Sequence, residues 1–123
     1  KDGRIISEMS QLRNAIEIYN FDKGSYSGSP SLTAACSDSD CSAYSVGTAE
    51  RDICALCKDI DSQNDANGSV PAFQADALEY CSYAVLASPA LKWYCIDEGR
   101  GVETITDPSY FCNGSTYTYD CPG

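Results

Sequence analysis

The sequence contains no histidine, so it lacks the side chain that most often serves as a general base or a metal ligand near neutral pH. It also has no G-x-S-x-G segment and no glycine-rich phosphate-binding loop, which are local signatures of many hydrolases and nucleotide-binding proteins. Neighbouring carboxylates such as Asp38 and Asp40 lie in polar stretches, without the apolar surroundings that make a carboxyl group a catalytic acid. These absences predict a protein that is not an enzyme.

Positive charge is also scarce. The chain has 8 Lys and Arg residues against 18 Asp and Glu residues, and its formal net charge is -10. Nucleic acids and anionic membrane surfaces attract basic proteins, so neither is expected as a direct partner. No apolar run reaches the roughly 18 residues that a membrane-spanning helix needs, so no segment of residues 1–123 is expected to cross a membrane. The length of 123 residues predicts a single domain over residues 1–123.

Cysteine, in contrast, is abundant, with 8 residues in a chain of 123. An even, high count in a short chain indicates disulfide bonds, and therefore an oxidising compartment. The cysteines are Cys36, Cys41, Cys54, Cys57, Cys81, Cys95, Cys112 and Cys121.

A long amphipathic helix is predicted over residues 1–22. Apolar residues recur there at alternating spacings of four and three, which places one apolar stripe along a helix. Gly24 supplies a left-handed stop, and Lys23 puts a cation near the carbonyl end of the helix. Charged residues such as Glu8 fall off the stripe and are expected to face water. The stripe, which we expect to form the helix side of the core, consists of Ile5, Met9, Leu12, Ile16 and Tyr19.

Residues 26–70 are predicted to be a variable connection that contains one short helix. Residues 26–47 are rich in Ser, Gly, Ala and Asp, and they are expected to be irregular. Thr48 can cap the short helix by accepting a hydrogen bond from a first-turn amide. Residues 61–70 are expected to form a polar turn that ends it. The buried side of the helix is expected to comprise Ile53, Leu56, Cys57 and Ile60.

The clearest β signal is a hairpin centred on Ser88, where a turn separates two runs rich in β-branched and aromatic residues. This centre places Cys81 directly opposite Cys95. Side chains alternate between the two faces of a strand, so the cysteines share one face, and Tyr94 and Ile96 lie on the other. Either face could pack on the long helix.

The hairpin is expected to belong to an antiparallel β-meander over residues 79–106, with V-E-T-I-T as its third strand. Before it, Pro71 is compatible with the first position of a helical turn, in which Phe73 and Leu78 would pack inward. After it, residues 107–123 are expected to form a small C-terminal region closed by a disulfide.

Four disulfide bonds are predicted. The hairpin register pairs Cys81 with Cys95, and a second bond would close the Asn-Gly turn of the C-terminal region. A bond between Cys54 and Cys57, inside one helical turn, would be strained, which favours nested pairs among the first four cysteines. The predicted pairs are Cys81–Cys95, Cys112–Cys121, Cys36–Cys57 and Cys41–Cys54.

Two alternatives remain open for the first four cysteines. Their C-x4-C and C-x2-C spacings are close to those of a structural zinc site, which would need all four as thiolates. The second spacing could instead be a thioredoxin-like redox pair at a helix N-terminus. It has neither a βαβ context nor a preceding tryptophan, and disulfides remain the favoured interpretation.

Calcium is a weak alternative at the end of the short helix. Asp59, Asp61, Asp65 and Asn67 offer oxygen ligands at alternating positions, as calcium-binding loops do. The fit to an EF-hand loop is poor, because glutamines would occupy its first and twelfth positions. A solvated acidic turn is the favoured interpretation, and no resident metal or other cofactor is predicted.

The opening segment resembles a known protein family. The run R-I-I-S-E-M-S-Q-L-R-N-A-I-E-I-Y-N-F-D-K-G-S-Y-S-G is similar to the part of the first helix just past the membrane-spanning half in type IV pilins and type II secretion pseudopilins. Met9 stands where the family usually has leucine. The matching positions are Arg4, Met9, Ala15, Ile16, Tyr19, Asp22, Gly24 and Tyr26.

The resemblance implies an α+β fold in which a long N-terminal helix packs on a small antiparallel sheet. It implies a structural subunit of an extracellular type IV pilus or pilus-like filament, whose partners are copies of itself or other pilins. A hydrophobic half-helix, expected before Lys1, would anchor an inner-membrane pool before assembly. Major pseudopilins bind calcium in their final loop, where Asp107 and Asp120 could serve here.

A secreted, disulfide-rich binding or adhesion module is the alternative function. Its partner would be a host or surface receptor. The chain has 9 tyrosines, more than a core of this size needs, and some would form subunit contacts or a binding surface. The candidates are Tyr110, Tyr117 and Tyr119.

Overall fold

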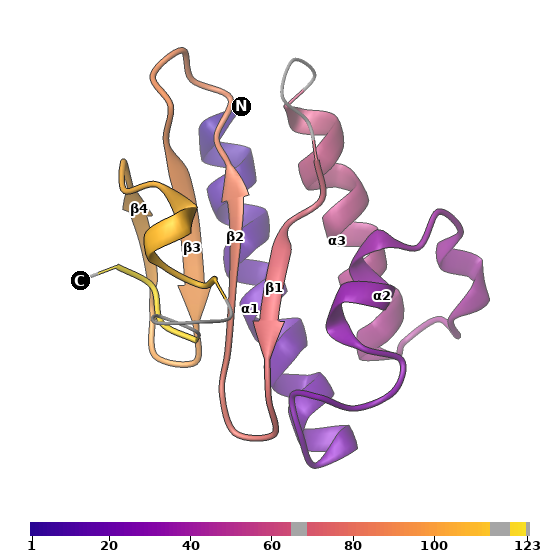
Figure 1. The fold of residues 1–123 in the computed structure, drawn as a ribbon. Helices are drawn as coiled ribbons and strands as arrows, with labels where there is room; N and C mark the ends of the chain where they lie inside the picture. Colours follow the sequence, from indigo (N-terminus) through magenta and orange to yellow (C-terminus); the bar gives the residue numbers. More distant parts are fainter. Residues whose placement is uncertain (65–68, 114–118, 123) are drawn as a thin grey trace.

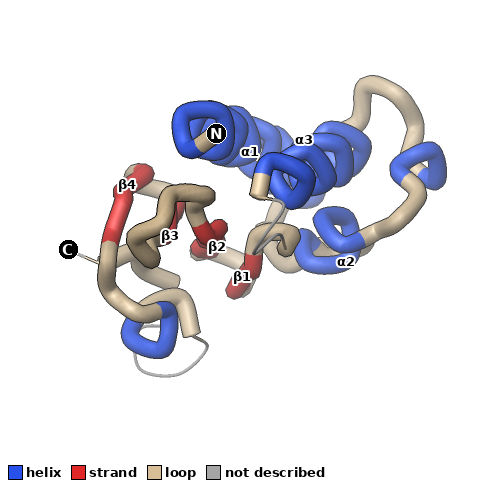
Figure 2. Tube along the Cα trace, turned by 90° about the horizontal axis from the view of Figure 1, so that it is seen from above, coloured by secondary structure: helices blue, strands red, loops and turns tan. Residues whose placement is uncertain are grey.

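A long N-terminal helix, α1 (Asp2–Lys23), lies along one face of a four-stranded antiparallel sheet, so the chain has the predicted α+β fold (Figure 1). The computed structural model describes residues 1–64, 69–113 and 119–122. Seen from above, α1 and the helical segment that follows it lie on one side of the sheet, and the C-terminal segment, with its own short helical turn, lies on the other (Figure 2). The sheet is therefore covered on both faces.

The helix α1 forms as its sequence pattern predicts. All five residues of the predicted stripe are fully buried, which confirms the helix side of the core. The helix ends at Gly24, whose φ of 73° is left-handed and whose N–H donates to the carbonyl of Asn20. Glycine adopts this conformation without steric cost, which explains the position of the stop. Among the helices in the described ranges, none combines the length and apolar character needed to cross a bilayer.

The sheet is a simple meander, because each strand pairs antiparallel with its neighbour in the sequence in the order β1-β2-β3-β4. It has one strand more than the predicted meander over residues 79–106, since β1 precedes that segment. The strands are β1 (Ala72–Ala75), β2 (Tyr80–Val85), β3 (Trp93–Asp97) and β4 (Gly101–Thr104).

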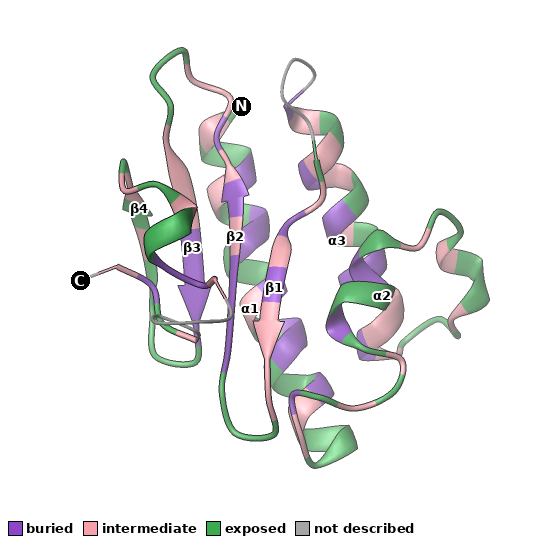
Figure 3. Ribbon diagram, in the orientation of Figure 1, coloured by how far each residue is buried: buried purple, intermediate pink, exposed green. Residues whose placement is uncertain are grey.

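The two faces of the sheet bury different residues. Tyr80 and Ala84 of β2 and Ile96 of β3 belong to the core that includes the stripe of α1. Cys81 and Cys95 lie on the opposite face, in a second, smaller core. The face of Tyr94 and Ile96 is thus the one that packs on α1. Figure 3 shows the buried residues of the helices and strands where the layers meet.

A helical segment follows α1 and packs beside it. It contains α2 (Leu32–Ser37), the 3-10 helix η1 (Cys41–Ala43) and α3 (Ala49–Gln63). The side chain of Thr48 accepts a hydrogen bond from the amide of Arg51, so the predicted cap of α3 is confirmed. A second 3-10 helix, η2 (Pro108–Tyr110), lies in the C-terminal segment.

The structure differs from the sequence-based interpretation in two places: the connection expected to be irregular, and residues 71–80, where a helical turn was one possibility. Residues 26–47 contain α2, which begins where Ser31 accepts a hydrogen bond from the amide of Ala34. Residues 71–80 contain β1 and no helical turn: Phe73 is buried, but Leu78 is 82% exposed. Antiparallel pairing with β2 decides this segment, and four residues carry too little alternation to signal it.

We predict that Ile16→Ala lowers the free energy of unfolding by about 2–5 kcal/mol, because it removes a fully buried side chain from the stripe. Denaturant titration followed by circular dichroism measures the loss. The matched control is Ile18→Ala, the same change on the same helix at a side chain that is 54% exposed, and it should cost about 0.5 kcal/mol or less. Equal losses in the two variants would contradict the assignment of the buried face.

Candidate functional site

Two disulfide bonds cross-link the helical segment internally. Cys36 of α2 bonds Cys57 of α3, and Cys41 of η1 bonds Cys54 of α3. These are the nested pairs predicted from the sequence, so both are confirmed. The bonds leave no thiolate for the alternative zinc site or redox pair. We call residues 31–63, with these bonds, the α2–α3 lobe.

The other four cysteines pair differently from the prediction. Cys81 bonds Cys112, and Cys95 bonds Cys121, so the predicted Cys81–Cys95 and Cys112–Cys121 bonds are wrong. Each observed bond joins a central strand to the C-terminal segment. The bonds span 31 and 26 residues, for which the chain-entropy model gives about 3.5 kcal/mol of stabilisation each.

The hairpin register explains the error. The sheet places Cys81 opposite Asp97 and Tyr83 opposite Cys95, a displacement of two residues from the predicted pairing. A shift by two keeps every side chain on its face, so both cysteines still point to the outer face, but they no longer lie opposite each other. Each is then available to a cysteine of the C-terminal segment.

A contact from α1 stabilises the longer hairpin loop. The Asp2 carboxylate accepts hydrogen bonds from the amides of Ala87 and Ser88, at 2.6 and 3.0 Å. Asp2 is 85 residues away from Ala87 in the sequence. The alternation of apolar and polar residues within the hairpin cannot reveal a contact from so far away in the chain. The sequence alone therefore predicted a tighter turn.

The C-terminal segment completes the second core on the outer face of the sheet. Phe111 is almost fully buried and contacts the ring of Tyr83 edge-on, with 5.4 Å between ring centroids. Trp93 and Val102 pack against the same cluster. The region is closed by bonds to the sheet, and the expected hairpin at Asn113 lies partly outside the described residues.

Asp97, at the end of β3, joins the sheet to its two coverings. One carboxylate oxygen accepts from the amides of Gly99 and Arg100, and the other accepts from the amide of Cys121 at 3.1 Å. Its backbone carbonyl accepts from the guanidinium of Arg13 on α1 at 3.0 Å. The local sequence around Asp97 carries no signal for this role, because Arg13 and Cys121 lie far away in the chain.

Of the four calcium candidates from the sequence, the structure describes Asp59 and Asp61. Asp59 and Asp61 lie on α3, and the carboxylate of Asp59 pairs with the guanidinium of Arg4 at 3.0 Å. Asp65 and Asn67 lie outside the described residues.

Of the final-loop candidates, Asp107 caps η2 by accepting from the amide of Ser109. Asp120 lies with Glu79 and Glu98 in an exposed group whose carboxylate oxygens are within 4.8 Å of one another. Partial desolvation, and then repulsion from Glu98, raises the pKa of Glu79. Calcium takes about six to eight oxygen ligands, so three exposed carboxylates do not by themselves define a calcium site.

A groove of about 470 Å³ runs between the outer sides of α1 and α3. Ile18, at its edge, is 54% exposed, and Phe21, one turn further along α1, is 86% exposed. This face of α1 therefore presents apolar surface that the described residues leave exposed. The groove is lined by Gln11, Asn14, Ala15, Ile18, Asp52, Ala55 and Leu56.

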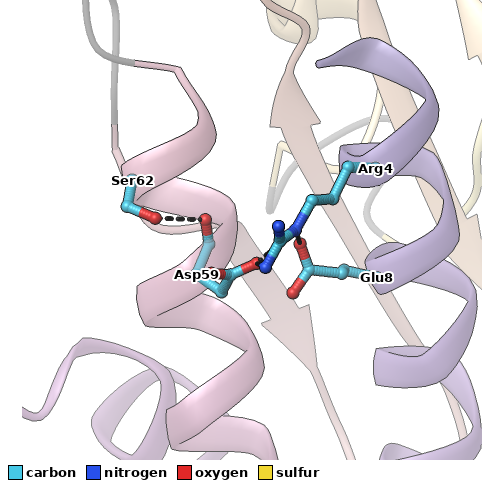
Figure 4. Close-up of polar contacts among 4 residues, drawn as sticks. All are labelled: Arg4, Glu8, Asp59 and Ser62. Atoms are coloured by element: carbon cyan, nitrogen blue, oxygen red, sulfur yellow. Dashed lines mark hydrogen bonds and ion pairs between the residues drawn. The ribbon is translucent and has the colours of Figure 1, made fainter.

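At the other end of the same interface, two carboxylates share one guanidinium. Arg4 donates to Glu8 on its own helix at 3.4 Å and to Asp59 on α3 at 3.0 Å (Figure 4). Glu8 was predicted to face water, but it is only 8% exposed, so that prediction was wrong. The sequence contains a partial signal for this burial. Glu8 and Ala15 are seven residues apart, so they lie on the same side of α1, next to the stripe, and widen its buried face toward a second helix.

The environment of Glu8 favours its neutral form. Burial first, and then the hydrogen bond and repulsion from Asp59, raise the pKa of Glu8 to about 7. The hydrogen bond from Glu8 lowers the pKa of Asp59. The two shifts favour one proton shared by the pair at acidic pH, with the negative charge on Asp59. We name Arg4, Glu8 and Asp59 the carboxyl clasp.

Comparisons of the chain with protein-family models, with characterised proteins and with solved structures found no match.

We predict that digestion of the unreduced protein with trypsin, after denaturation, releases one disulfide-linked assembly of three peptides, residues 59–92, 93–100 and 101–123. Mass spectrometry identifies it. Further cleavage before Asp120 separates Cys112 from Cys121 and assigns each bond. Release of residues 101–123 as a separate peptide with an internal bond would restore the hairpin pairing and contradict the structure.

Proposed function

We propose that this protein is a structural subunit of an extracellular type IV pilus or pilus-like filament. The proposal is supported by where the pilin-like motif of the opening helix lies in the fold. The motif residues Ile16 and Tyr19 lie on the buried face of a long helix that packs across an antiparallel meander. A helix fixed in this way on a small domain is suited to pack against its copies while the domain stays outside.

The four disulfides place the protein in an oxidising compartment. They also suit a load-bearing subunit. A domain of 123 residues buries a modest core, and covalent bonds across the sheet and within the α2–α3 lobe resist unfolding and proteolysis where no chaperone acts.

The subunit contact in this proposal is the outer face of α1. Ile18 and Phe21 expose apolar surface beside the groove between α1 and α3. Exposed aromatic and branched aliphatic residues on one side of a helix are typical anchors of protein interfaces. Copies of this chain or other pilins would cover them in the filament.

A secreted binding or adhesion module is the second candidate function. The same disulfides fit it, and exposed side chains outside α1, such as Tyr110 on η2, would then contact a host or surface receptor. The two functions differ in whether copies of the chain associate through α1.

Site-specific photo-crosslinking in the native host tests the proposal. A benzophenone amino acid at Phe21 of the full gene product should yield a ladder at multiples of the subunit mass in sheared filaments after irradiation. The matched control is the same group at Leu78, which is equally exposed but lies on the β1–β2 turn, and it should give no ladder.

Recovery of the chain only as a free monomer in the medium, with no ladder from Phe21, would contradict the filament and favour the secreted module. The gene gives a second check. The filament requires about 20 apolar residues encoded directly before Lys1, whereas a conventional signal peptide at that place would favour the module.

A further inference from the structure

The α2–α3 lobe is held on the rest of the fold by packing and polar contacts, because both of its disulfides are internal. At one end of its interface with α1, Lys23 pairs with Glu50 at 3.3 Å. At the other end lies the carboxyl clasp. The side-chain amide of Asn64, just past α3, donates to the carbonyls at the end of β2.

We propose that the carboxyl clasp is a pH-sensitive contact, in which Glu8 must carry a proton for the α2–α3 lobe to pack fully on the N-terminal half of α1. Arg4 Nε lies 3.4 Å from Glu8 Oε1 and 3.0 Å from Asp59 Oδ2, so a proton on Glu8 has the Asp59 carboxylate as its acceptor. Loss of the proton leaves two negative charges at the interface. Because Asn64 still ties the end of α3 to the sheet, the change is a loosening of the interface and not a release.

One guanidinium cannot offset this second charge. The charged groups that act on Glu8 are Arg4 from its own helix and Asp59 from the facing helix. Arg4 is closer to Asp59 than to Glu8, and its side chain is 61% exposed, so water screens its attraction. Glu8, in contrast, is nearly buried, and an ionised carboxylate there loses its hydration.

The direction of the pH effect follows from the shifts. The pKa of Glu8 rises from 4.5 to about 7 on folding. Between these values the folded state holds a proton that the unfolded chain has lost, so the stabilisation is complete below 4.5 and disappears as the pH rises toward 7. The lowered pKa of Asp59 acts in the opposite sense, but only below its ordinary value of 3.8, outside this window.

Hydrogen exchange of backbone amides tests the proposal. Between about pH 5.5 and about pH 8, the protection factors of amides in the last two turns of α3 should fall by about tenfold or more in the wild-type chain, after correction for intrinsic exchange rates. Amides of β2 and β3, away from the clasp, should change much less.

Three variants make the result specific. Glu8→Gln keeps a donor toward Asp59 and should remove the pH response, and Asp59→Asn should reduce it by removing the opposing charge. Glu103→Gln, which removes an exposed carboxylate on β4, should leave the response as in the wild type. A wild-type response confined to α3 and abolished in Glu8→Gln supports the clasp. Protection in α3 that is independent of pH, or a response that survives in Glu8→Gln, overturns it.

Discussion

The structure depends on covering both faces of a small sheet. Strands of four to six residues offer little area, and a face left open to water would expose apolar side chains along its whole length. On one face, α1 buries its stripe against the strands. On the other, the C-terminal segment is held by bonds from Cys112 and Cys121, and Phe111 is buried in the same cluster. The short meander β1–β4 and the irregular C-terminal segment would each be unstable alone, and they stabilise each other through these contacts.

Features governed by local chemistry could be predicted from the sequence. The stripe of α1, its glycine stop and the cap of α3 at Thr48 follow from periodicity and hydrogen bonding within a few residues. The nested pairs of the α2–α3 lobe were favoured because a bond between Cys54 and Cys57, inside one helical turn, would be strained. The outer pairs did not, because they depend on the hairpin register, and the loop of the hairpin is held by Asp2 from the far end of the chain. The strand β1 escaped prediction for a similar reason, since its partner decides its conformation.

The interface between α1 and α3 shows how a narrow pattern can mislead. A repeat of 3.5 residues indicates one apolar seam, but α1 contacts two layers, the sheet and α3. Residues beside the stripe therefore become buried, and one of them is Glu8. A carboxyl group at such a place makes the contact between the helices depend on protonation. An apolar residue there would pack without that dependence, so the fold gains sensitivity to its surroundings at a cost in stability near neutral pH.

Two contacts described above fix α1 relative to the two ends of the sheet. Asp2 binds the loop that joins β2 to β3, and Arg13 binds the carbonyls of Asp97 and Glu98 where β3 turns toward β4. Sliding the helix along its axis by one turn, about 5.4 Å, would break both sets at once. Rotation about the axis would do the same. A pull on this helix is therefore transmitted directly into the strands.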